Sequence, residues 1–284
     1  MSVICSVGST WRGFATTRRL VVFGASYCAV ENVLNHDARK PTAAEPLGTP
    51  FPGNGVWNEE DLPNWVGHLI TNYRPGPRYT PPKQPHQPGS ADDQSAEWIE
   101  HPLLVNDYAK GGDTVMGVAR QIRSVYVPGL GTNPAAARWS ADDTLFITWV
   151  GINDCAVGAK DGILDELFKL QEEVYNTGAR NFVFIDLPPI HRSPAVPHGS
   201  SRAGSMEKTF SQWNLNLREA AKKFSATHAD SSVFIFSSFE LFNTLLDNPQ
   251  GPWLHSAQPC RFSRTDSCQF LNMVLVRSSR ASWG

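Results

Sequence analysis

The stretch Leu20-Val21-Val22-Phe23-Gly24-Ala25-Ser26 is a short apolar run that ends in three small residues. Apolar runs of this length without polar alternation are typical of strands that are buried on both faces of a parallel sheet. Similar runs follow at residues 103–107, 145–150, 182–185 and 233–236. The pattern predicts five buried strands, the first of them at residues 20–23.

The segments between these runs have apolar residues at helical spacing. In residues 163–177 the apolar side chains fall on one broad face, and Gly178 is placed to end the helix. Residues 64–73, 114–125 and 206–224 are also predicted as helices. Strands that alternate with helices predict a doubly wound α/β sandwich, built as a single domain with right-handed crossovers.

Composition argues against several classes of function. The chain has 284 residues, of which 41% are hydrophobic and 18% charged, with a formal net charge of -2. This balance suits a globular core but creates no strong field, so we expect neither a nucleic-acid nor a membrane-surface partner. No segment approaches the roughly 18 apolar residues of a membrane span, and no signal peptide is visible.

The five cysteines are scattered, and none forms a CxxC pair. We therefore expect neither a zinc site nor a disulfide scaffold, although a Cys260–Cys268 bridge stays open. Two segments differ from the rest. Residues 73–89 contain six prolines, which predicts a surface insertion over 73–96, and residues 261–284 carry four arginines and one acid. We expect one domain over residues 11–260, followed by an atypical tail over 261–284.

Three polar or glycine positions follow the predicted strands. Ser26 comes directly after the first strand, at the sheet edge where α/β proteins place their sites. Gly112 follows the second strand in a Gly-Gly pair that can present a backbone N–H, and Asn153 follows the third with a side-chain amide that can donate to an oxyanion. Each has a plainer explanation: Ser26 and Asn153 as helix or turn caps, and Gly112 as part of an ordinary turn with Asp113 as the cap.

Taken in order, Ser26, Gly112 and Asn153 resemble blocks I, II and III of the GDSL/SGNH hydrolase superfamily. The wider match is to its fungal carbohydrate-esterase (acetylesterase) branch. The matching motifs are Trp11-Arg12-Gly13-Phe14, Gly55-Val56-Trp57, His101-Pro102-Leu103-Leu104, Gly112-Asp113-Thr114, Gly151-Ile152-Asn153-Asp154, Asp186-Leu187-Pro188-Pro189, Arg192-Ser193-Pro194 and Leu246-Asp247-Asn248-Pro249. A G-x-S-x-G elbow and a G-x-G-x-x-G turn are both absent, which argues against an α/β-hydrolase and a dinucleotide-binding fold.

The resemblance implies a three-layer α/β/α sandwich with a mainly parallel, flavodoxin-like sheet. It implies Ser26 as the nucleophile, with an oxyanion hole made of the N–H groups of Ser26 and Gly112 and the amide of Asn153. The implied substrate is a small-molecule or carbohydrate ester. The resemblance also implies a monomeric enzyme without a cofactor, from a family whose members are usually secreted. Trp57, Trp65 and Trp149 are candidates to stack on a sugar, with core packing as the alternative.

The sequence departs from the family pattern at two places. The Asp that usually precedes the nucleophile is Ala25, and no Asp-x-x-His pair occurs near the C-terminus or elsewhere. Three other histidines are alternatives for the base, His191, His198 and His255, although a lone loop histidine is usually a solvated surface residue. Two hypotheses follow: an esterase whose true C-terminus is missing from this version of the chain, or a non-catalytic protein that binds carbohydrate or ester ligands.

Overall fold

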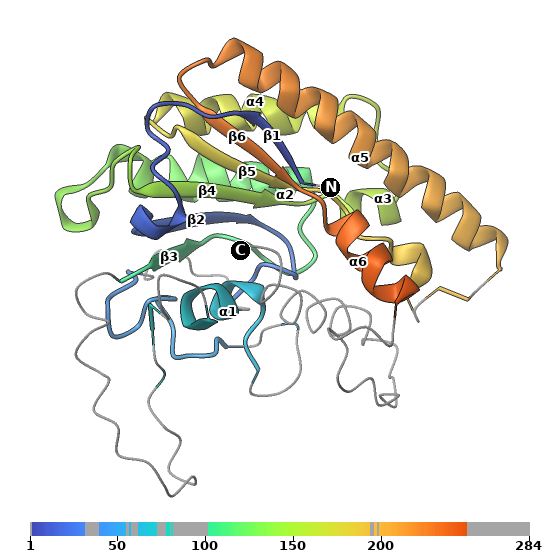
Figure 1. The fold of residues 1–284 in the computed structure, drawn as a ribbon, viewed down its shortest axis with the longest axis horizontal. Coiled ribbons are helices and arrows are strands. Elements are labelled where there is room, and N and C mark those ends of the chain that lie inside the picture. Colours follow the sequence, from blue (N-terminus) through green and yellow to red (C-terminus); the bar gives the residue numbers. More distant parts are fainter. Residues whose placement is uncertain are drawn as a thin grey trace, which may run out of the picture.

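A mostly parallel sheet of six strands forms the centre of the molecule (Figure 1). A computed structural model describes residues 2–31, 40–54, 57, 62–72, 78–79, 81, 102–193, 196–197 and 199–248. The strands, in chain order, are β1 (Val3–Ser6), β2 (Arg19–Gly24), β3 (Leu104–Asp107), β4 (Thr144–Trp149), β5 (Asn181–Ile185) and β6 (Ser232–Phe236). The five predicted strands are all present, each within two residues of its predicted bounds.

The strands lie in the order β1-β6-β5-β4-β2-β3. Strands β2 to β6 are parallel to their neighbours, and β1 joins the β6 edge antiparallel, with an irregularity between Ile4 and Ser6. Without β1, the order is the flavodoxin-like one, in which the first strand lies between the second and the third. The predicted fold class is therefore confirmed.

Burial explains which strands could be predicted. Every residue of β2 and β4 is buried, as expected for central strands covered on both faces. Strand β1 was not predicted. It has four residues, of which Ile4 is 68% exposed, so it lacks the continuous apolar run that marks the other strands.

The helices are α1 (Trp65–Asn72), α2 (Val115–Arg120), α3 (Ile152–Ala156), α4 (Ile163–Asn176), α5 (Ser201–Thr227) and α6 (Ser238–Asp247). Helices α2, α4 and α5 pack side by side and cover one face of the sheet. Helix α1 belongs to the β2–β3 connection. This connection steps toward the β3 edge of the sheet, whereas the later connections, to β4, β5 and β6, step toward the other edge. Because crossovers are right-handed, α1 lies on the other face of the sheet.

Helix α1 matches the helix predicted over 64–73 within one residue at each end. Helix α4 agrees with the prediction within one residue, and Gly178 follows it with a φ of 105°, as predicted for the glycine that ends it. Helix α5 begins earlier than predicted, because the Ser200 hydroxyl accepts a hydrogen bond from the Ala203 N–H at 3.2 Å and starts the helix there.

The predicted helix over 114–125 is two segments. Helix α2 ends at Arg120 and continues as a π-helix, Gln121–Tyr126. Gln121 and Tyr126 are five residues apart and both buried, and the wider π turn lets residues at this spacing face the same side. The sequence pattern does not separate the two helix types.

The Pro-rich insertion over 73–96 lies mostly outside the described residues, and the tail 261–284 lies entirely outside them. No helix in the described ranges is both long and apolar enough to cross a membrane.

Candidate active site

The strand order reverses between β2 and β4, since the chain passes from β2 to β3 on one side and later to β4 on the other. In parallel α/β sheets, ligands bind beyond the carboxyl ends of the strands at such a reversal. Ser26 follows the end of β2 and Asn153 follows the end of β4, so the two residues lie on either side of the reversal. Gly112 follows β3, the other neighbour of β2.

Ser26 is the one residue of the stretch 19–30 that is not buried. All the others in that stretch are buried, and Ser26 is partly exposed. A buried strand thus leads to a single accessible serine at the carboxyl edge of the sheet. This is the placement that a nucleophilic hydroxyl requires.

The backbone after Ser26 forms a turn, closed by the N–H groups of Cys28 and Ala29, which both donate to the Ala25 carbonyl. No regular helix follows Ser26 over residues 25–31, although the local sequence is compatible with one. The reason is competition from side chains. The Nδ2 of Asn64 donates to the Cys28 and Ala29 carbonyls at 3.0 Å each.

The same turn is fixed from the sheet. The Val30 N–H donates to the Asp107 carboxylate at 2.8 Å, and that carboxylate also accepts from the Ala109 N–H at 2.8 Å. Asp107 ends β3 and is buried. With no regular helix at residues 25–31, the alternative explanation of Ser26 as a helix cap does not apply.

Gly112 lies on an exposed turn beyond β3, with a φ of 82°. That conformation favours glycine over residues with a side chain. A Cβ built on Gly112 would meet nothing within 4 Å, so the space beside this residue is open. The turn is anchored to the nucleophile strand, because the Lys110 N–H donates to the Gly24 carbonyl at 3.2 Å.

Asn153 and Asp154 connect the β4 end to the Gly112 turn. The Nδ2 of Asn153 donates to the Asp113 carbonyl at 2.8 Å, and the Asp154 carboxylate accepts from the Val115 N–H at 3.1 Å. Asp154 therefore supplies an acceptor for the first N–H of α2, a role that the sequence pattern had offered to Asp113. Asn153 is partly exposed and Asp154 is buried.

The side-chain amide of Gln121 links the Ser26 turn to the Gly112 turn by hydrogen bonds. Its Nε2 donates to the Gly24 carbonyl and to Asp113 Oδ2, both at 2.8 Å, and its Oε1 accepts from the Gly24 N–H at 3.0 Å. Gln121 is 3% exposed. Sequence analysis missed this residue, because a glutamine within a helical pattern carries no signal of its own.

Burial shifts the pKa of two groups near these turns. It raises the pKa of the Asp154 carboxyl, against the opposing effect of the Val115 N–H. It also raises the pKa of the Cys28 thiol well above its ordinary value, so Cys28 stays a neutral thiol two residues after Ser26. Of the side chains of Ser26 and Cys28, that of the accessible Ser26 is the one suited to nucleophilic attack.

Ala25, which replaces the family Asp, is buried, with 8% of its surface exposed. His191 lies in a short 3-10 helix, Ile190–Arg192, after β5. Its buried Nδ1 has no hydrogen-bond partner among the described residues, and burial lowers the pKa of the ring. His198, His255 and the Cys260–Cys268 pair lie outside the described residues.

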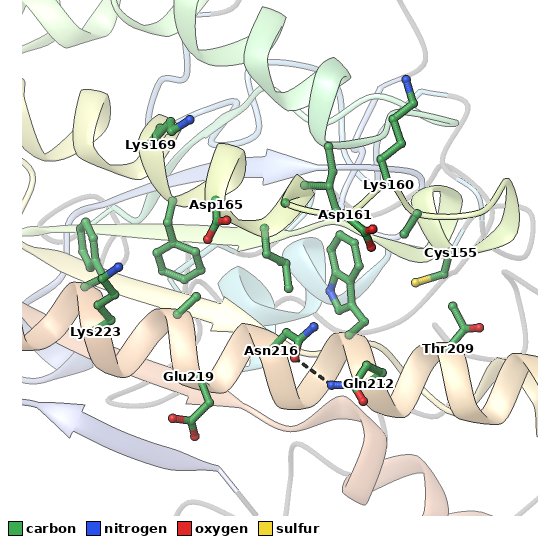
Figure 2. Close-up of a pocket in the computed structure, with 18 of the residues that line it drawn as sticks. Cys155, Lys160, Asp161, Asp165, Lys169, Thr209, Gln212, Asn216, Glu219 and Lys223 are labelled. Atoms are coloured by element: carbon green, nitrogen blue, oxygen red, sulfur yellow. Dashed lines mark hydrogen bonds between the residues drawn. The ribbon is translucent and has the colours of Figure 1, made fainter.

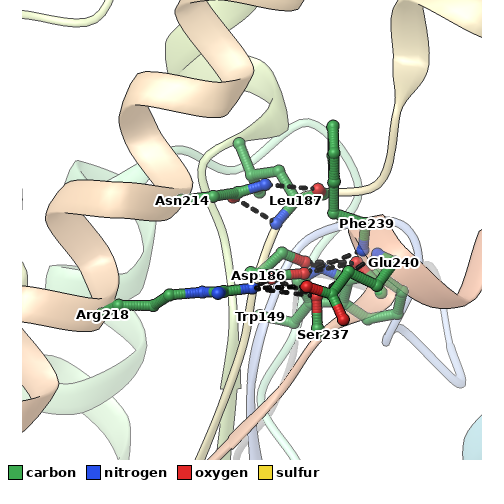
Figure 3. Close-up of polar contacts among 9 residues, drawn as sticks. Trp149, Asp186, Leu187, Asn214, Arg218, Ser237, Phe239 and Glu240 are labelled. Atoms are coloured by element: carbon green, nitrogen blue, oxygen red, sulfur yellow. Dashed lines mark hydrogen bonds and ion pairs between the residues drawn. The ribbon is translucent and has the colours of Figure 1, made fainter. Parts of the chain in front are cut away.

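Asp186, from the Asp186-Leu187-Pro188-Pro189 motif, is surrounded by hydrogen-bond donors of the protein itself (Figure 3). Its fully buried carboxylate accepts from Ser237 Oγ at 2.7 Å, the Phe239 N–H at 2.9 Å and Arg218 at 3.2 Å. Its carbonyl accepts from Trp149 Nε1 at 3.0 Å. Asp186 thus joins the ends of β4, β5 and β6 without being exposed to a substrate.

A groove of about 1170 Å³ runs between α4 and α5 (Figure 2). Its lining combines basic residues such as Lys160 and Lys223 with acidic ones such as Asp161 and Glu219, and includes none of the three candidate site residues. No three His, Cys, Asp or Glu residues in the described ranges are placed to hold a metal ion.

The three tryptophans considered for sugar stacking differ in exposure. Trp149 is 3% exposed, and Trp65 packs against the core. Trp57 is 38% exposed, and its indole Nε1 lies 2.5 Å from where a Cβ on Gly111 would stand. Core packing therefore accounts for Trp149 and Trp65, and Trp57 borders the Gly112 turn.

With this geometry, the chain can be compared with known proteins. It is similar to an acetylesterase of Thermothelomyces thermophilus, with 28% identity over 268 residues, covering 90% of this chain and 82% of that one. No protein-family model matches the sequence.

Among solved structures, one similar chain is a member of the lipolytic G-D-S-L family from Veillonella parvula, with a TM-score of 0.45 and 12% identity, covering 93% of this chain and 97% of that one. Another is an extracellular lipase of Streptomyces rimosus, with a TM-score of 0.40 and 13% identity, covering 93% and 99%.

Proposed function

We propose that this chain is a serine ester hydrolase of the SGNH type that removes short acyl groups, in particular acetyl, from small or carbohydrate esters. The observation that carries the proposal is the exposure of Ser26. It is the accessible residue in an otherwise buried stretch, at the edge from which Gly112 and Asn153 also emerge. The similarity to an acetylesterase over 90% of the chain supports acetyl as the acyl group.

The reaction proceeds by acyl transfer through Ser26. Its Oγ attacks the ester carbonyl carbon, the Oγ proton passes to a base, and a tetrahedral oxyanion forms. Collapse of the oxyanion breaks the bond to the alcohol, which leaves with a proton. Water then attacks the acyl-serine, releasing the acid and restoring the hydroxyl.

The oxyanion is stabilised by donors that the fold holds in advance. These are the N–H groups of Ser26 and Gly112 and the Nδ2 of Asn153. One Nδ2 hydrogen is used by the Asp113 carbonyl, and the amide carries a second one. Each such donor typically contributes about 3 kcal/mol to the barrier reduction. We expect the enzyme to act as a monomer without a cofactor.

A second candidate is a binding protein that keeps the pocket but not turnover. It is favoured by a specific observation: the sequence contains no Asp-x-x-His pair, and alanine precedes the serine. Without a base, a serine hydroxyl is a poor nucleophile at neutral pH.

The deciding experiment is hydrolysis of p-nitrophenyl acetate and of an acetylated xylo-oligosaccharide by the purified chain and by Ser26→Ala. The proposed hydrolase predicts turnover that Ser26→Ala reduces by about 10³-fold or more. Saturable binding of the oligosaccharide without Ser26-dependent turnover would favour the binding protein instead.

A further inference from the structure

We propose that Gln121 is a positioning residue that aligns the Ser26 turn with the Gly112 turn. This inference rests on the proposed function and adds to it a residue that does not touch the substrate. The amide of Gln121 contacts Gly24, two residues before Ser26, and Asp113, the residue directly after Gly112. A single side chain thus spans the nucleophile and one of the oxyanion donors.

The hydrogen bonds define how this amide is oriented. Both Nε2 hydrogens are used, one by the Gly24 carbonyl and one by Asp113 Oδ2, while Oε1 accepts from the Gly24 N–H. Turning the amide over would set its oxygen against two acceptors and its NH2 group against a donor. The amide both accepts from the Gly24 N–H and donates to the Gly24 carbonyl, as a peptide group of a neighbouring strand would. It does so at a position that β3, which ends at Asp107, does not reach.

The surroundings leave little freedom for either turn to shift. A Cβ on Gly24 would lie 2.5 Å from the Trp149 carbonyl, and a Cβ on Gly117 would lie 2.2 Å from Asp113 Cγ. Both glycines therefore allow close packing that a methyl group would prevent. The backbone at Gly24 and the carboxylate of Asp113 are held between these contacts and the Gln121 amide.

Gln121 is also the first residue of the π-helix. π-helical turns are uncommon and are frequent at functional sites. Both polar atoms of the Gln121 side chain contact the two turns, and its helical segment is irregular. A role in positioning the turns explains these features better than packing alone.

The test uses Gln121→Glu, which keeps size and the acceptor for the Gly24 N–H but sets a carboxylate oxygen against the Gly24 carbonyl and Asp113. Two matched controls are available. Gln171→Glu places the same change at a fully buried glutamine of α4, and Arg120→Gln removes an exposed partner of the same Asp113 carboxylate. Gln121→Met, which fills the space without polar atoms, is the second test variant.

The readout is the rate at which diethyl p-nitrophenyl phosphate modifies Ser26, followed by p-nitrophenolate release and the mass of the Ser26 peptide. In this step the Oγ–P bond forms, the bond to p-nitrophenolate breaks, and the Oγ proton is lost. Because no turnover is needed, the comparison holds even if the wild-type chain does not hydrolyse acetate esters. In that case the hydrolase proposal fails while the Gln121 inference is still decided.

We expect both Gln121 variants to label Ser26 about 10-fold or more slowly, with both controls within about 3-fold of wild type. Where esters are hydrolysed, kcat should fall and KM should change little. The deficit of Gln121→Glu should shrink as the pH is lowered from about 8 to about 5, because the protonated carboxyl regains a donor.

Labelling of both Gln121 variants at the wild-type rate would overturn the inference. So would a loss of folding in both Gln121 variants while Gln171→Glu folds, because Gln121 would then be structural. Failure of the wild-type chain to label at Ser26 would overturn this inference and the proposed function together.

Discussion

The side-chain amide of Asn153 donates a hydrogen bond to the backbone carbonyl of Asp113, with 2.8 Å between Nδ2 and the oxygen. This contact joins the residue that follows β4 to the turn that follows β3, across the end of β2. It fixes the direction of the amide before any ligand arrives. A donor held in this way needs no reorganisation when charge develops on a substrate oxygen, which is the condition for effective oxyanion stabilisation.

Asn153→Ala should therefore lower kcat by about 100-fold or more, with a smaller change in KM. The free energy of unfolding should fall by about 1 kcal/mol, since one hydrogen bond is lost. Steady-state kinetics and denaturant unfolding measure the two effects separately. The control is Asn133→Ala, which removes an Nδ2 hydrogen bond to the Trp139 carbonyl and a second bond that Asn133 Oδ1 accepts from the Trp139 N–H, both at 3.0 Å. A loss of kcat of the same size in the control would argue against a role in oxyanion binding.

Gly112→Ala tests the backbone donor. The φ of 82° makes a side chain costly there, by about 1 kcal/mol, although a Cβ would meet no atom. Relief of this strain would turn the N–H away, so kcat should fall about 10-fold or more. Gly13 has a φ of 92° and equally open surroundings, and it precedes β2 at the opposite end of that strand. Gly13→Ala should lose similar stability and keep its activity; equal activity of the two variants would contradict the prediction.

The strands, and the places of the three candidate residues after them, were predictable because burial on both faces leaves a direct mark on sequence. Strands such as β2 and β4 are continuous apolar runs, and the polar residues that follow them stand out. The contacts that hold the turns left no such mark. Asn64 and Gln121 are ordinary polar residues in helical patterns, and their partners lie 35 and 97 positions away in the chain.

The stretch after Ser26 illustrates the same limit. Local sequence allowed a helix at that point, but Asn64 and Asp107 take up the backbone groups that a helix would pair. Tertiary contacts of this kind override local propensity. The half-exposed edge strand β1 was missed for a related reason, since pairing with β6 decides its structure and it has no continuous apolar run.

Trp57→Ala tests whether the substrate is a sugar ester. Trp57 is partly exposed beside Gly111, the neighbour of Gly112. If Gly112 binds the oxyanion, we expect a sugar on the ester to contact this indole ring. KM for an acetylated xylo-oligosaccharide should rise about 10-fold, which corresponds to about 1.4 kcal/mol of lost stacking. KM for p-nitrophenyl acetate should stay within about 2-fold, and Trp57→Phe should recover part of the loss. A parallel increase of KM for both substrates would point to a general disturbance of the turn.

Asp154 gives a prediction about pH. Burial raises the pKa of its carboxyl above the ordinary value of 3.8, so the folded chain holds the proton more tightly than the unfolded chain does. The resulting stabilisation is fully present below the unfolded pKa and is lost as the pH rises through the folded one. Asp154→Asn removes this titration but keeps an oxygen to accept from the Val115 N–H.

The melting temperature of Asp154→Asn minus that of wild type should therefore increase as the pH is raised from about 4 to about 7. Asp154→Ala, which loses the acceptor, should be less stable than Asp154→Asn by about 1 kcal/mol at either pH. Thermal unfolding across this range checks both statements. If the wild-type and Asp154→Asn curves ran parallel, the carboxyl would have the same pKa in the folded and unfolded chains, and its burial under α2 would carry no electrostatic cost.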